Sequence, residues 1–141
     1  MQDRYDAMVR DMLAKHGVHV RRWRTAMTGV AWDAKDKAGV RRKWIEAPRP
    51  KGPMSAAVFL HEVGHHAIGL GAYRPRCLEE YHAWAFAIAE MERHGLNVTD
   101  GVRRRMHASL HYAIAKAGRR GLKQVPPELS PYVCPPTKKR R

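Results

Sequence analysis

Two histidines four residues apart carry the clearest chemical meaning in this sequence. His61 and His65 stand in the order His-Glu-Val-Gly-His, with Glu62 between them. On a helix, residues i and i+4 share a face, so both imidazoles can bind one ion while Glu62 lies beside it. Two neutral histidines, a carboxylate as third ligand and an open position for water form a typical catalytic zinc site. The motif therefore predicts a Zn²⁺ site in which Glu62 activates a zinc-bound water for attack on a carbonyl.

The third ligand is expected from the helix that follows the motif. Glu79 and Glu80 both lie at the start of an apolar helical segment, after a short loop. Acidic residues are also favoured in a first helical turn by the helix dipole, which explains one of them without any metal. The spacing leaves open which of the two completes the site.

Hydrolysis of a peptide bond also needs a donor that stabilises the oxyanion beyond the metal itself. Tyr73, Tyr81, His82, His107 and His111 carry suitable groups. We favour His111 as the transition-state stabiliser, because it lies off the apolar stripe of its helix and could face a cleft. The alternative is that His111 is an ordinary solvated helix residue.

The elements that must position these groups follow from hydrophobic spacing and from turn residues. Apolar residues at helical spacing predict four helices, and the second of them carries the motif. Three segments of strand character separate the first helix from the second. The helices are expected over residues 4–16, 54–70, 77–94 and 100–117, and the strands over 18–23, 29–32 and 40–45.

Together these elements predict an α+β fold. A small antiparallel sheet of about three strands should pack on the metal-binding helix and on two to three further helices. Residues 1–130 are expected to form one domain, because 141 residues suffice for a single core, and residues 131–141 a basic, disordered tail. Residues 42–46 are expected to form the sheet edge that pairs with an extended substrate.

The segment that follows the motif resembles the ImmA/IrrE-like metallopeptidases. In that family an H-E-x-G-H helix precedes a helix with the pattern E-x-x-A-x-x-F-A, which reads Glu80-x-x-Ala83-x-x-Phe86-Ala87 here. The likeness covers about residues 18–91. The chain differs from the family in lacking a separate helix-turn-helix or sensor domain.

This resemblance implies a minimal zincin-like metallopeptidase that cleaves a regulatory protein, often a repressor, in bacteria or their mobile elements. It gives the role of general acid and base to Glu62, and it implies the zinc ligands His61, His65 and Glu80.

The balance of charge points to a polyanionic partner as an alternative. The formal net charge is +14 and the pI is near 10.5, which favours salt-sensitive, non-specific contact with nucleic acid. A second function class is therefore a non-catalytic, basic nucleic-acid-binding protein, and a third is a degenerate zincin that serves as a binding module. The expected phosphate contacts are Arg103, Arg104, Arg105, Arg119 and Arg120.

The cysteine content and the N-terminal sequence indicate in which cellular compartment the protein is expected. Cys77 and Cys134 form neither a disulfide framework nor a C-x-x-C pair. No secretory signal or membrane span is predicted, so we expect a soluble cytoplasmic enzyme with a protein substrate. The sequence does not predict the oligomeric state.

Overall fold

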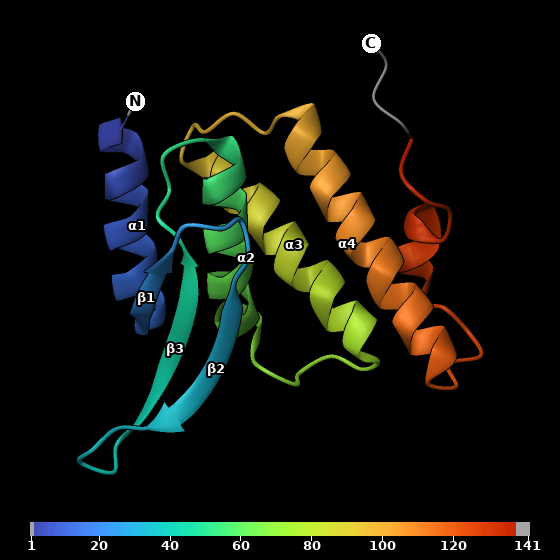
Figure 1. Ribbon diagram of the computed structural model, residues 1–141, viewed down its shortest axis with the longest axis horizontal. Helices are drawn as coiled ribbons and strands as arrows, with labels where there is room; N and C mark the ends of the chain where they lie inside the picture. Colours follow the sequence, from blue (N-terminus) through green and yellow to red (C-terminus); the bar gives the residue numbers. More distant parts are fainter. Residues whose placement is uncertain (1, 138–141) are drawn as a thin grey trace.

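Four α-helices, three strands and one 3₁₀ helix make up the computed structural model, which describes residues 2–137 (Figure 1). The predicted α+β class is confirmed, and each helix and strand expected from the sequence is present. In chain order the elements are α1 (Gln2–His16), β1 (Val18–Arg24), β2 (Val30–Lys35), β3 (Arg41–Pro48), α2 (Pro53–Ile68), α3 (Arg76–Arg93), α4 (Asp100–Arg119) and η1 (Pro127–Tyr132).

The sheet is mixed, so the prediction of an antiparallel sheet is wrong in this respect. Its strand order is β1-β3-β2. β2 and β3 form an antiparallel hairpin, whereas β1 pairs with β3 in parallel. The connection from β1 to β2 carries the chain past the position of β3, and β3 then returns between them. Residues 42–46, expected at an edge, therefore lie in the central strand with hydrogen-bonded neighbours on both sides.

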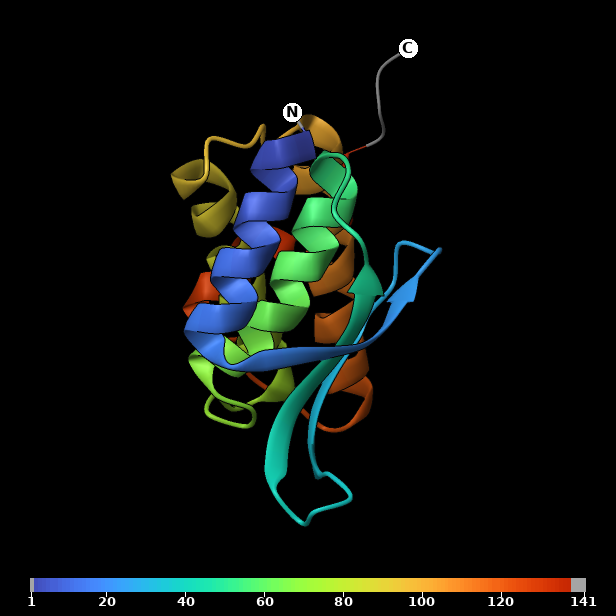
Figure 2. The ribbon, with the colours of Figure 1, turned by 90° about the vertical axis from the view of Figure 1, so that its left-hand side faces the viewer.

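Helix α2 is the central element of the fold. Its first turn is held by Ser55, whose hydroxyl accepts hydrogen bonds from the N–H groups of Lys51 at 2.9 Å and Gly52 at 3.1 Å. It ends at Gly69, which has a φ of 94°, a value that favours glycine. Helix α2 packs against β3 and α1 on one side and against α3 on the other (Figures 1 and 2). This position places the motif between the sheet and the rest of the helices.

Helices α2 and α3 approach closely at Gly64. A Cβ atom on this glycine would lie 2.8 Å from the backbone oxygen of Ala83 and 3.0 Å from Cδ1 of Phe86. Any side chain here would push the two helices apart. The glycine inside the motif therefore sets the distance between the histidines on α2 and the acidic residues on α3.

Gly64→Ala is expected to destabilise the protein. Overpacking against a backbone oxygen costs about 1–3 kcal/mol, which outweighs the gain of at most about 1 kcal/mol in helix propensity. Urea denaturation of the variant measures this loss. Gly118→Ala in α4 is the matched control, because its Cβ would meet nothing within 4 Å and should be neutral or stabilising. Equal stability of the parent and Gly64→Ala would show that the helices can separate freely.

The C-terminal part of the chain packs on the far side of α3. Helix α4 begins at Thr99, whose side chain accepts a hydrogen bond from the N–H of Val102 at 3.1 Å. The 3₁₀ helix η1 contacts both α4 and α3, and its Leu129 is fully buried. The predicted domain boundary after residue 130 falls inside η1. Of the expected tail, residues 138–141 lie outside the described residues.

No helix within residues 2–137 has the length and apolar character that crossing a membrane requires.

Candidate metal centre

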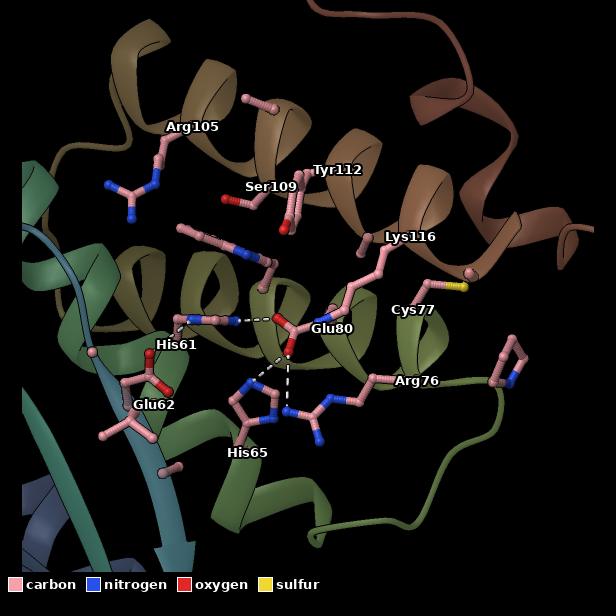
Figure 3. Close-up of a pocket in the computed structure, with 18 of the residues that line it drawn as sticks. His61, Glu62, His65, Arg76, Cys77, Glu80, Arg105, Ser109, Tyr112 and Lys116 are labelled. Carbon is pink, nitrogen blue, oxygen red and sulfur yellow. Dashed lines mark hydrogen bonds and ion pairs between the residues drawn. The ribbon is translucent and has the colours of Figure 1, made fainter. Parts of the chain in front are cut away.

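The two motif histidines and Glu80 converge on one point between α2 and α3 (Figure 3). His61 Nε2 lies 2.9 Å from Glu80 Oε2, and His65 Nε2 lies 3.2 Å from Glu80 Oε1. One ligand atom from each of the three residues lies within 4.8 Å of the others. The arrangement presents two imidazole nitrogens and a carboxylate to a common centre, so the cluster can hold a metal ion.

Glu79 takes a different position from Glu80. Its Oε2 lies 2.7 Å from His65 Nδ1, and its Oε1 accepts a hydrogen bond from the Gly71 N–H at 2.7 Å. When Nδ1 donates its hydrogen to this carboxylate, Nε2, which faces Glu80, is the nitrogen that can bind a cation. Glu80 is thus the acidic member of the cluster. Glu79 orients His65 through its contact with Nδ1.

Glu62 lies beside the cluster and is not one of its three ligand residues. Its Oε2 is 3.4 Å from His61 Nδ1, and the residue lines the cavity described below. The backbone of Gly29, just before β2, covers it closely: a Cβ atom on Gly29 would lie 2.8 Å from Glu62 Oε2. Packing therefore limits the carboxylate to a small range of positions next to the cluster.

Trp84 supports the cluster from α3. Its ring stacks on that of His61, with centroids 4.5 Å apart and an interplanar angle of 19°. This tryptophan is 1% exposed. Its contact with His61 was not predicted, although its position one turn after Glu80 on the same helix indicates it.

His66, the histidine that directly follows the motif, has a structural role. Its Nε2 lies 2.9 Å from the Trp44 carbonyl oxygen, to which it donates. The ring thus ties α2 to β3 and points away from the cluster.

The electrostatics of the cluster favour a cation. Burial lowers the pKa of His61, but the carboxylates of Glu62 and Glu80 raise it, and the net value is about 9. Burial raises the pKa of Glu80, yet His61 and His65 outweigh that effect and hold it well below its usual range. Without a metal, the cluster at neutral pH is therefore an ion pair between the His61 imidazolium and ionised Glu80.

A large cavity opens in front of the cluster. Its volume is about 1210 Å³, and its walls come from α2, α3, α4 and the start of β2. The lining residues include Val30 and Ala31 of β2, an edge strand. The sheet edge that borders the cavity is thus β2 and not residues 42–46.

His111, predicted as a transition-state stabiliser, is not among the residues that line the cavity. Its Nδ1 lies 3.1 Å from the Tyr132 carbonyl oxygen, and the ring faces η1. Helix α4 instead lines the cavity with Arg105, Ser109, Tyr112 and Lys116. Of these, only Arg105 was named from the sequence, and there as a phosphate contact. Their spacing of i, i+4, i+7 and i+11 is the signal that could have identified them.

The arginines expected to contact nucleic acid do not lie on one common surface. Arg105 and Arg120 line the cavity, whereas Arg103 and Arg119 are exposed and do not line it. Arg104 is half-buried on α4.

Comparisons of the chain with protein families, with curated proteins and with solved structures find no match. The likeness to the ImmA/IrrE-like metallopeptidases therefore depends on the motif residues alone.

Proposed function

We propose that this protein is a zinc-dependent metallopeptidase that hydrolyses peptide bonds of a protein substrate. The observation that carries the proposal is the convergence of His61, His65 and Glu80 at the wall of a cavity that also exposes Glu62. Two imidazoles and one carboxylate are a donor set that suits zinc and leaves a coordination position open. The oriented His65 and the spacing of the motif support the same assignment.

A structural zinc site is less consistent with these residues. Structural sites are normally closed by four protein ligands, and among the described residues His61, His65 and Glu80 form the one group of His, Cys, Asp and Glu with metal-ligand spacing. A structural site also has no use for Glu62. Cys77 lines the cavity without joining the cluster, and Cys134 is exposed. Two free cysteines are consistent with a reducing cytoplasm.

The reaction we propose divides the work between the metal and Glu62. When bound, zinc acidifies water and polarises a carbonyl group. Glu62 accepts a proton from the attacking water as the new C–O bond forms, and it delivers this proton to the amine nitrogen as the C–N bond breaks. The edge of β2 aligns the peptide, and Tyr112 on the cavity wall supplies the additional donor toward the oxyanion.

A test of this proposal is cleavage of a complex peptide mixture. The zinc-loaded protein is incubated with peptides from a proteome digest, and new termini are identified by mass spectrometry. We expect new termini that a chelator suppresses and that added zinc restores. Full zinc loading with no new termini from either peptides or unfolded proteins would contradict the proposal.

Zinc binding is expected to release about one proton per chain at pH 7. The pKa of His61 is raised to about 9 in the metal-free protein, so at pH 7 its ring is protonated and must lose that proton to bind zinc. The apparent zinc affinity should therefore rise about tenfold per pH unit below pH 9 and level off above it. Calorimetry at pH 7 in two buffers of different ionisation enthalpy counts the protons. No proton release would show that His61 is neutral before the metal binds.

A further inference from the structure

One face of α4 forms a cationic wall opposite the proposed metal site. Arg105, Ser109, Tyr112 and Lys116 follow each other along this face, and Arg120 continues it by one turn. In Figure 3 Arg105 lies toward the end of the site that holds His61 and Glu62, and the Lys116 side chain extends toward Glu80. The wall thus carries a positive charge at each end of the site, with hydroxyl groups between.

The negative charges inside the cavity do not neutralise this wall. The carboxylates that line it are Glu62 and Glu80, and both already face the motif histidines. Glu80 also pairs with Arg76 at 3.6 Å. Within residues 2–137, Arg105 and Lys116 form no salt bridge at a 4.0 Å limit. A bound zinc ion would add two further positive charges.

A hydrogen bond holds Arg105 in place between α4 and the loop before β2. Its Nη2 donates a hydrogen bond to the Met27 carbonyl oxygen at 2.8 Å, which links α4 to the loop before β2. A guanidinium group has five N–H donors, so most of them remain available to a ligand. An arginine anchored in this way loses little side-chain entropy when it binds a carboxylate.

We infer that the cavity takes a polypeptide segment with acidic side chains on both sides of the bond to be cut. This inference rests on the proposed function and names its substrate class. Arg105 and Lys116 are eleven residues apart on α4, which corresponds to about 16 Å along the helix. An extended peptide covers that distance in about five residues. One acidic residue near each end of such a segment would meet one cation.

The test compares two labelled peptides by fluorescence anisotropy. One carries Asp or Glu two and three residues from its centre on both sides, and the other carries Asn or Gln at the same places. Both are titrated into the zinc-loaded full chain with Glu62→Gln, which prevents cleavage. The same titrations use chains that add Arg105→Glu with Lys116→Glu, or the milder Arg105→Gln with Lys116→Gln. Circular dichroism and zinc content check that each variant folds.

A matched control changes the same net charge at another place. Arg10→Glu with Lys15→Glu alters two exposed residues of α1 that do not line the cavity. We expect the parent to prefer the acidic peptide about tenfold at low salt, the cavity variants to lose this preference, and the control to keep it. Equal binding of the two peptides, or an equal loss in the control, would overturn the inference.

Two further outcomes separate this inference from the proposed function. Cleavage of the peptide mixture with no enrichment of acidic residues near the cut bonds would refute the acidic substrate and leave the peptidase intact. An acidic preference that depends on Arg105 and Lys116, without any cleavage by the parent chain, would support an acidic polypeptide as the occupant of the cavity and refute the peptidase. Tighter binding of a short oligothymidylate than of the acidic peptide, lost in the same variants, would make nucleic acid the occupant and overturn the inference.

Discussion

Glu62→Gln is expected to abolish peptide hydrolysis while the protein keeps its zinc. A glutamine amide has nearly the shape of the carboxylate but cannot accept the proton of the attacking water, and general-base catalysis of this kind contributes about 10²- to 10⁴-fold to a rate. Glu62 does not belong to the cluster of ligand atoms, so the metal site itself should survive. The measurement is the cleavage rate at saturating zinc, beside the zinc content of the same sample.

The matched control for this variant is Glu128→Gln, an exposed residue in the first turn of η1. It makes the same chemical change far along the chain from the motif and should leave the cleavage rate unchanged. Undiminished cleavage by Glu62→Gln would rule out the proton-transfer role of this residue. Loss of zinc in Glu62→Gln would instead mean that Glu62 helps to hold the metal.

Glu80→Gln is expected to weaken zinc binding much more than Glu79→Gln. Removing the charge of Glu80 removes the anionic ligand, whereas Glu79 acts through His65, where such supporting contacts change metal affinity about 10- to 100-fold. Glutamine at position 79 can still accept from His65 Nδ1, so its effect should fall near the lower end of that range. The two variants differ by one position in the chain and are therefore each other's control.

Competition titrations against a chromophoric chelator measure the two zinc affinities directly. The expected order is parent, then Glu79→Gln, then Glu80→Gln, with the last at least about a hundredfold below the parent. The reverse order of the two variants would assign the ligand role to Glu79. It would also require α3 to turn about its axis relative to α2.

The spacing of residues in the sequence does not decide between Glu79 and Glu80 as the third ligand. Consecutive residues on a helix point about 100° apart, so the ligand is selected by the rotation of α3 about its own axis. That rotation is set by the contact of Gly64 with Ala83 and Phe86, which joins two helices and is not visible in the spacing of either. The resemblance to a family favoured Glu80, and the geometry brings the same residue into the cluster.

The histidines on α2 were predictable because their geometry is local. A separation of four residues on a helix fixes a shared face whatever surrounds it. Likewise, hydrophobic spacing and turn residues located the helices and strands closely. The strand order was not predictable in this way, because the turn between β2 and β3 indicates a hairpin but does not show on which side β1 adds.

The position of α4 relative to the site is a tertiary property for the same reason. Its buried stripe includes Val102, Met106 and Leu110, and the sequence identifies that stripe correctly. Of the two flanks beside it, one faces the cavity and the other faces η1. Since His111 falls on the flank that η1 covers, a residue chosen for lying off the apolar stripe was placed on the wrong side.

The metal content of the purified protein shows whether His61, His65 and Glu80 hold a zinc ion. Elemental analysis of the parent is compared with His61→Ala, which removes one nitrogen ligand of the cluster. We expect about one zinc per parent chain and loss of this zinc in the variant, with circular dichroism showing that both are folded. No zinc in the parent after reloading, or the same zinc content in the two proteins, would contradict a metal site at His61, His65 and Glu80.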